Sequence, residues 1–279
     1  MAQAVSAKLE DGNLRAAIRI TYSDDIPAQP TGDALQKLQV KHPSASGKLN
    51  DLPDINPDLI HSVTESDVRQ AVLSFPAGSS GGPDGMRPQH LKDLLMCRES
   101  GTDFLAALTG FTNAVLAGLC PKAAAPFFFG GRLLALNKKS GGIRPIAVGV
   151  TLRRLASKCA NTHGAARMAP LFGPRQHGVD IGGAARQPFI RLAATYRVCL
   201  LTKLKLDFAN AFNSLHRSDM LLSIRDCLPE FYAFCLSSYA QPSFLFFGSH
   251  VILSQEDPQQ GDPLGPLLFC TTVTLSFPR

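Results

Sequence analysis

The sequence lacks the features that mark a membrane-spanning, secreted or zinc-binding protein. It contains no tryptophan, and no apolar run approaches the roughly 18 residues that a membrane helix needs. Its N-terminus has no basic start leading into an apolar core, so no secretory signal is visible. The 7 cysteines are scattered, without a Cys-x-x-Cys pair. We therefore expect reduced thiols, no zinc site, no membrane partner and an intracellular setting, nuclear or cytoplasmic.

Acidic residues are scarce in the middle of the chain. Between residues 131 and 217 there are 15 Lys and Arg but only two acids, Asp180 and Asp207. The remaining residues hold 13 cations and 20 acids, so the overall net charge of +6 conceals a strongly basic segment. A solvated basic helix face normally carries acids as well, which favours the alternative of a surface that binds a polyanion. Nucleic acid bound through its phosphates is the expected partner, with salt-sensitive affinity.

Helix and strand patterns alternate along the chain and indicate an α+β fold. A capping-box sequence at residues 64–67 predicts the start of one helix, and residues 41–60 predict an irregular connector. Apolar spacing predicts helices over 14–20, 64–75, 88–96, 102–119, 151–168, 218–228 and 230–240, and another after residue 260. Hairpins are expected over 127–149 and 243–254, and a further strand over 200–208.

The segment 204–221, LKLDFANAFNSLHRSDML, places a carboxylate directly after an apolar strand. Asp207 at the mouth of a buried strand is a natural ligand for a hard cation such as Mg2+. Phe212 lies five residues later, where its ring can form the floor of a nucleotide pocket. The alternative is that Asp207 only ends the strand and caps the turn after it. Two other segments favour the metal site.

The segment 258–269, PQQGDPLGPLLF, places a polar loop before an apolar helix. Gly261 allows the backbone to approach a ligand closely, and Gln260 offers both a donor and an acceptor. The segment 136–148, LNKKSGGIRPIAV, predicts a hairpin whose cations can hold phosphates, namely Lys138, Lys139 and Arg144.

The helix predicted after that hairpin is basic. Arg153, Arg154 and Lys158 lie on nearby turns of it. Because residues three to four apart share a helix face, we expect these three side chains to meet a phosphate backbone together.

Together these segments resemble the reverse transcriptase of non-LTR (LINE-like) retrotransposons. The resemblance also takes in residues 78–95, 141–161 and 176–193, and it covers roughly residues 60 to 270 in the family's order. It implies a right-hand polymerase with fingers and palm, which uses an RNA template, a DNA primer and dNTPs. The family's nucleotidyl transfer needs two metal ions, Mg2+ or Mn2+.

The resemblance also implies roles for individual residues. Asp207 is similar to the first metal-binding aspartate of the palm, and Phe212 to the steric gate that excludes a ribose 2′-OH. Gln260 and Gly261 are similar to the loop that touches the incoming nucleotide and the template. Arg144, with Lys138 or Lys139, is similar to the pair of fingers residues that binds the triphosphate.

The chain departs from the family's pattern at several places. The second carboxylate motif, x-Asp-Asp, is expected after the helix that begins beyond Gln260, but residues 263–279 contain no acid. Tyr22-Ser23-Asp24-Asp25 spells that motif far upstream, and Pro27 and Pro30 make a surface turn the preferred interpretation there. Asp257-Pro258 stands where the family usually has Gly-Val, which is expected to disturb the loop.

These departures predict a fragment of fingers and palm, truncated before the x-Asp-Asp hairpin and the thumb. The expected organisation is a pre-fingers segment and connector over 1–60, a fingers-like region over 61–199 and a partial palm over 200–279. Three functions remain open: a polymerase-lineage fragment that is inactive alone, a non-enzymatic nucleic-acid-binding module, and a decayed retroelement product. Oligomeric state and template preference are left open as well.

Overall fold

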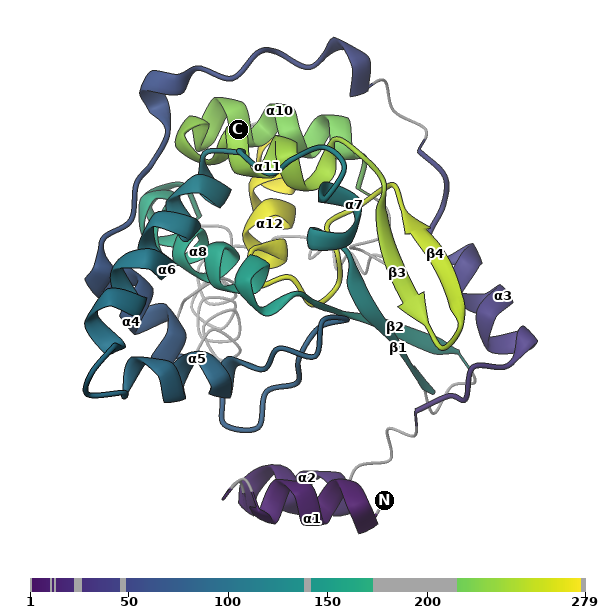
Figure 1. Ribbon diagram of the computed structural model, residues 1–279. Coiled ribbons are helices and arrows are strands. Elements are labelled where there is room, and N and C mark those ends of the chain that lie inside the picture. The colour runs from purple at the N-terminus through teal and green to yellow at the C-terminus, as the bar shows by residue number, and fades with distance from the viewer. Residues whose placement is uncertain are drawn as a thin grey trace, which may run out of the picture.

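The computed structural model describes residues 2–10, 12, 14–22, 27–45, 49–137, 142–172 and 215–276. In these ranges a body of packed helices lies beside one four-stranded mixed sheet, in agreement with the expected α+β class (Figure 1). No helix in the described ranges is both long and apolar enough to cross a membrane.

The N-terminal part of the chain forms three short helices joined to the body by an extended connector. Helices α1 (Ala2–Glu10) and α2 (Leu14–Tyr22) pack on each other below the main body in Figure 1. Helix α3 (Gly32–Val40) lies against the sheet instead. The expected irregular connector contains only two short 3-10 turns in its described residues, η1 (Leu49–Asp51) and η2 (Pro57–Leu59).

The helical body begins at the predicted capping box. The Thr64 hydroxyl accepts a hydrogen bond from the Asp67 amide, and the Asp67 carboxylate accepts one from the Thr64 amide at 2.9 Å. The body comprises α4 (Glu65–Leu73), α5 (Pro88–Leu95), α6 (Gly101–Leu116), α7 (Ala125–Phe128), α8 (Thr151–Phe172), α10 (Arg217–Cys227), η4 (Pro229–Phe231), α11 (Tyr232–Tyr239) and α12 (Gly265–Ser276). Helix α6 ends earlier than predicted because Gly118 takes a φ of 75°, which a continuing helix cannot contain.

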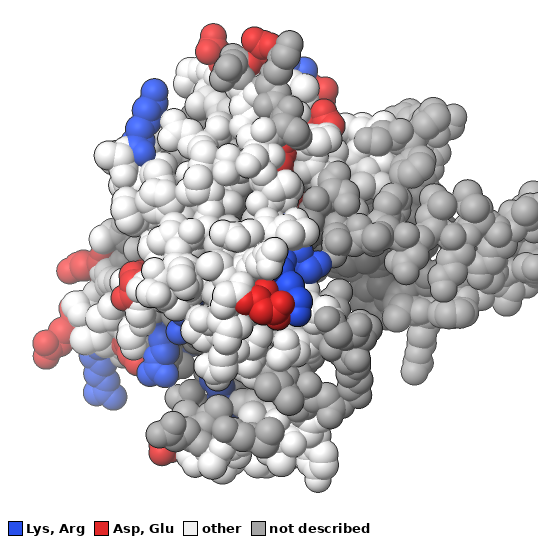
Figure 2. All heavy atoms as spheres, turned by 90° about the vertical axis from the view of Figure 1, so that its right-hand side faces the viewer, with Lys and Arg blue, Asp and Glu red and all other residues white. Residues whose placement is uncertain are grey.

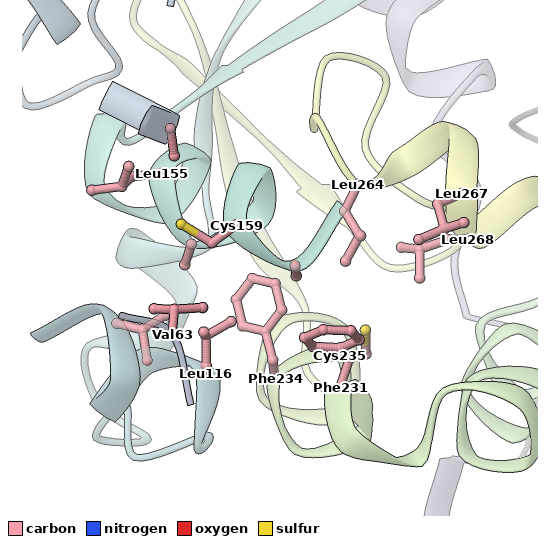
Figure 3. Packing of buried hydrophobic residues seen from close by; sticks show 14 of the residues in the cluster. Val63, Leu116, Leu155, Cys159, Phe231, Phe234, Cys235, Leu264, Leu267 and Leu268 are labelled. Carbon is pink, nitrogen blue, oxygen red and sulfur yellow. The ribbon is translucent and has the colours of Figure 1, made fainter. Parts of the chain in front are cut away.

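One large hydrophobic core holds these helices together (Figure 3). Its centre is formed by residues that are distant in sequence and come from α8, α11 and α12, among them Leu155, Phe234 and Leu267. Helices α8 and α12 approach closely: a Cβ atom on Gly164 would lie 2.6 Å from a methyl carbon of Leu267. The core therefore fixes α12, and with it the polar loop that precedes α12.

The sheet is assembled from two hairpins with the strand order β2-β1-β3-β4. Strands β1 (Gly131–Asn137) and β2 (Ile143–Gly149) form the first antiparallel hairpin, and β3 (Ser243–Phe247) and β4 (His250–Ser254) form the second. Both hairpins confirm the sequence predictions. The hairpins join through a short parallel pairing of β1 with β3, in which Arg132 lies opposite Phe246.

The two faces of the sheet have different surroundings. Inward-pointing residues of β1 and β2, including Leu133 and Ala147, pack with Ala34 and Leu38 of α3 in a second, smaller core. The alternate residues of both strands are exposed or half-buried, so the opposite face is much less covered. Figure 2 views the side with α3. The lysines and arginines coloured there, which belong to the described part of the chain, stand apart with acids among them rather than gathering into one patch.

Candidate functional site

The loop before α12 docks on the outer edge of β2. The amide of Ala147 donates a hydrogen bond to the carbonyl of Gln260 at 2.8 Å. Gly261 has a φ of 126°, and a Cβ atom there would lie only 2.2 Å from the Ala147 carbonyl oxygen. The two segments predicted to bind a nucleotide therefore touch each other, although they are far apart in the sequence. Glycine is required at 261 by this close backbone approach.

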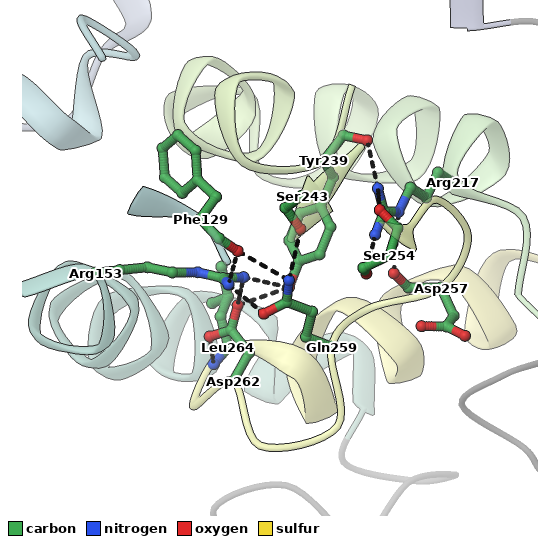
Figure 4. A network of polar contacts seen from close by, with 10 residues as sticks. All are labelled: Phe129, Arg153, Arg217, Tyr239, Ser243, Ser254, Asp257, Gln259, Asp262 and Leu264. Atoms are coloured by element: carbon green, nitrogen blue, oxygen red, sulfur yellow. Dashed lines mark hydrogen bonds and ion pairs between the residues drawn. The ribbon is translucent and has the colours of Figure 1, made fainter. Parts of the chain in front are cut away.

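A buried arginine anchors the same loop (Figure 4). The guanidinium of Arg153 forms a salt bridge with Asp262 at 2.8 Å, and both side chains are 2% exposed. It also donates hydrogen bonds to the Phe129 carbonyl at 2.5 Å, to the Tyr239 hydroxyl at 3.1 Å and to the side-chain oxygen of Gln259. The expectation that Arg153 meets a phosphate backbone is thus wrong, because its charge is already neutralised inside the protein.

The partners of Arg153 also bind one another. The Tyr239 hydroxyl donates to Asp262 at 2.6 Å, and the other carboxylate oxygen of Asp262 accepts from the Leu264 amide at 3.0 Å. Burial, together with the charge of Asp262, raises the pKa of Tyr239 well above its usual range, so the hydroxyl keeps its proton. The amide nitrogen of Gln259 donates to Phe129 and to Ser243, each at 2.8 Å. The side chains that hold the loop are therefore held in turn by their own neighbours.

A second buried arginine supports the start of the loop. Arg217 donates to the carbonyl of Asp257 at 3.1 Å, and to the carbonyl and hydroxyl of Ser254 at 3.1 and 2.7 Å. Burial lowers its pKa to about 10, which leaves the guanidinium charged at neutral pH. The ring of Tyr239 lies 5.5 Å from the Arg153 guanidinium carbon and 5.1 Å from that of Arg217, within the range of cation–π attraction.

Asp257 adopts a left-handed backbone conformation with a φ of 59°. An aspartate reaches this region at a cost of about 1 kcal/mol that glycine does not incur. The position is the one at which the sequence departs from the Gly-Val of the family it resembles. The loop keeps its docking on β2 nevertheless, because Arg217 binds the carbonyl of Asp257 and the buried network holds Gln259.

The glycine-rich turn at residues 78–85 meets the same region. A Cβ atom on Gly82 would lie 2.7 Å from the carbonyl oxygen of Gly149, at the end of β2. Arg154 donates to the Ser80 carbonyl at 2.7 Å, and the Thr151 hydroxyl donates to the Met86 carbonyl. Three of the sequence segments that carry the resemblance thus converge on the end of β2 and the start of α8.

Arg154 and Lys158 form a half-buried cationic pair on α8. The Arg154 guanidinium carbon lies 5.2 Å and the Lys158 ammonium 4.9 Å from the centre of the Phe75 ring. Burial lowers the pKa of Lys158, and the charge of Arg154 lowers it further. Of the three α8 cations that were expected to share a face, only these two do so.

Several predicted site residues lie outside the described ranges. They are Asp207, Phe212, Lys138 and Lys139. Arg144 is described and exposed on β2, and the side chain of Gln260 is half-buried. Within the described ranges, no group of three His, Cys, Asp or Glu is arranged to hold a metal ion.

The functional residues that sequence reasoning missed are those that hold the loop from within. Asp262 and Gln259 stand in a segment that was recognised, but their burial could not be seen from it. Arg217 stands in the recognised segment 204–221 and Tyr239 in α11, but neither carries a sequence signal that links it to this loop.

No protein-family model and no curated protein matches this chain.

A separate cavity of about 400 Å3 lies between α4 and α8. The rings of His61 and His163 stack there, with centroids 4.0 Å apart, and the Phe231 ring meets both edge-on. Glu230 forms a salt bridge with Arg167 at 2.7 Å and lies 3.9 Å from His163. The cavity thus places two imidazoles in contact beside a buried carboxylate.

We expect removal of Arg153 to lower the free energy of unfolding far more than removal of an exposed arginine does. Arg153→Met leaves the buried Asp262 carboxylate without its counter-charge, which should lower the free energy of unfolding by about 3–5 kcal/mol. Arg225→Met is the matched control, because Arg225 and Asp226 form an ion pair with side chains 40% and 55% exposed. That pair should contribute about 0–1 kcal/mol. Urea denaturation measures both, and equal losses would contradict a structural role for the buried ion pair.

We expect His61 to make stability depend on pH. Burial lowers the pKa of His61, His163 lowers it further, and Glu230 and Asp67 act in the opposite direction. The unfolded chain therefore binds this proton more readily, so stability is complete above the ordinary histidine pKa of 6.5 and is lost as the pH falls through the folded pKa.

His61→Gln should flatten the thermal-melting profile between about pH 7 and pH 5. His250→Gln, at an exposed position of β4, is the matched control. His42, whose pKa burial also lowers, contributes to the slope that remains. A His61→Gln profile identical to that of the unaltered protein would exclude this titration as a determinant of stability.

Proposed function

We propose that this chain belongs to the reverse-transcriptase lineage of non-LTR retroelements. In this proposal it supplies the fingers and part of the palm for RNA-directed DNA synthesis. The observation that carries the proposal is the backbone contact between Ala147 and Gln260, with Gly261 packed on the same residue's carbonyl. A hairpin that holds the triphosphate and a loop that touches the incoming nucleotide must be neighbours in such a pocket.

The described residues would act by positioning the nucleotide. Arg144, exposed on β2, is proposed to bind the triphosphate, for which its planar guanidinium is well suited. Of the two adjacent glutamines, Gln259 is buried in the network that holds the loop, which leaves the half-buried Gln260 side chain for the nucleotide. A loop fixed in this way loses little conformational entropy when the nucleotide binds.

Mg2+ or Mn2+ is the proposed cofactor, with Asp207 as a ligand and Phe212 as the steric gate. A two-metal polymerase site neutralises the triphosphate and the leaving pyrophosphate with several carboxylate-bound charges. Residues 263–279 contain no acid that could supply the second carboxylate motif. We therefore propose that these 279 residues bind substrates but do not polymerise by themselves.

A non-enzymatic nucleic-acid-binding module is the second candidate. It is favoured by the exposure of Arg132 and Arg144 on one uncovered sheet face, with no acid anywhere in the four described strands. The two candidates differ in whether dNTPs bind at all.

Nucleotide binding is expected to depend on Arg144. With a fluorescent dATP analogue and Mg2+, Arg144→Gln should weaken binding by about 10-fold or more, the usual loss for a hydrogen bond to a charged group. Arg98→Gln is the matched control, since Arg98 is exposed on a turn outside the sheet. If Arg144→Gln binds the analogue as tightly as the control does, the fingers role is wrong and the non-enzymatic module becomes the better candidate.

Primer extension is expected to be absent for the chain alone. A poly(A) template with an oligo(dT) primer and either Mg2+ or Mn2+ should give no product, because one carboxylate leaves the transition-state charge uncompensated. Synthesis that Asp207→Ala abolishes would overturn the proposed inactivity while supporting the polymerase lineage. Synthesis that persists in Asp207→Ala would indicate a contaminating polymerase, and repurification would then be required.

A further inference from the structure

The sheet face opposite α3 is aromatic, basic and open. Strand pairing places side chains on it in rows that run across the sheet. One row joins Val148 of β2, Arg132 of β1, Phe246 of β3 and Val251 of β4, which are successive partners in the register. Val251 is 52% exposed and Phe246 is half-buried, so the row is accessible from solvent.

A neighbouring row extends the aromatic surface toward α7. Phe244 pairs with Leu253, which is 40% exposed. The Phe244 ring lies 6.4 Å from the Phe246 ring and 4.8 Å from the ring of Phe127, which is 57% exposed. Phe127, Phe244 and Phe246 thus form a continuous series of rings beside Arg132.

The charge of this face has one sign. Arg144 of β2 pairs with Leu136 of β1, and its side chain points to the same face as that of Arg132. Because Leu136 lies four residues beyond Arg132 on β1, the two arginines are about 13 Å apart along the strands. The four strands contain no Asp or Glu, and no carboxylate among the described residues pairs with either arginine. An apolar protein partner would have to bury both guanidiniums without a counter-charge, which is costly.

We propose that this face binds single-stranded nucleic acid. Bases would stack on the rings of Phe244 and Phe246, and Arg132, next to Phe246 in the register, would bind a phosphate of the same strand. Arg144 lies beyond Arg132, on the side away from the rings, and adds positive charge to the same face. A single strand satisfies both features at once, because it offers free base faces and a regular negative charge. A duplex keeps its bases stacked on each other and so cannot present them to a flat aromatic surface. The inference rests on the proposed function in taking nucleic acid as the partner.

Fluorescence anisotropy with a labelled 12-nucleotide oligo(U) tests the proposal, with a duplex of equal length for comparison. Phe246→Leu keeps the apolar character but removes the aromatic ring, and should weaken single-strand binding by about 5- to 150-fold. Duplex binding should stay within about twofold. Tyr22→Leu is the matched control, because the Tyr22 ring is 83% exposed on α2, away from the sheet. A thermal melt of each variant verifies that it is folded.

The arginines are tested by salt dependence. Arg132→Gln should weaken single-strand binding and reduce the slope of log affinity against log salt by about 1. Lys122→Gln, at an exposed position outside the sheet, should leave the slope unchanged. Equal single-strand affinity for Phe246→Leu and the unaltered protein would overturn the proposal. Concentration-dependent dimers that Val251→Asp dissociates, without oligo(U) binding, would overturn it in favour of a second copy of the chain.

Failure of this inference is distinguishable from failure of the proposed function. If the dATP analogue still binds in an Arg144-dependent way while Phe246→Leu has no effect, only the single-strand surface is wrong. If oligo(U) binding depends on Phe246 but the analogue does not bind, only the polymerase role is wrong.

Discussion

The arrangement of the site depends on one buried ion pair, between Arg153 and Asp262. It links α8 to the loop before α12. Tyr239 and Gln259 accept further hydrogen bonds from Arg153, and Tyr239 donates one to Asp262. A pair of this kind adds little net stability over an apolar core, since desolvation offsets much of the attraction. Its importance lies in geometry. An apolar contact tolerates sliding, whereas a guanidinium bonded to a carbonyl, an amide, a hydroxyl and a carboxylate allows one position for the loop.

This position of the loop before α12 brings parts of the chain that are distant in sequence into contact. The loop lies along the free edge of β2, the glycine-rich turn lies against the end of the same strand, and α8 leaves from that point. At Ala147 the outer edge of β2 is thereby paired with the protein's own backbone rather than left open to pairing with another chain. The same contact brings Arg144 and Gln260 onto neighbouring segments, which is the basis of the proposed nucleotide site.

Much of the local structure could be predicted from the sequence, because it depends on short-range patterns. The capping box at Thr64 and the hairpin over residues 243–254 are examples, and both appear as expected. Arg153 is an example of what short-range patterns do not reveal. Helical spacing groups it with Arg154 and Lys158, but its ion-pair partner in the core, Asp262, is remote in sequence. The left-handed backbone of Asp257 could not be predicted either, since an aspartate adopts it only when surrounding contacts hold it there.

The parallel pairing of β1 with β3 also constrains how the protein folds. Each hairpin closes a short loop and can form within microseconds, but joining them requires the ends of a segment of roughly a hundred residues to meet. Contacts of such long sequence separation slow folding. The sheet, and the nucleic-acid surface proposed on it, is therefore complete only after α8, α10 and α11 have brought the second hairpin to the first. During synthesis, the edge of β1 that pairs with β3 therefore stays unpaired until the second hairpin has been synthesised.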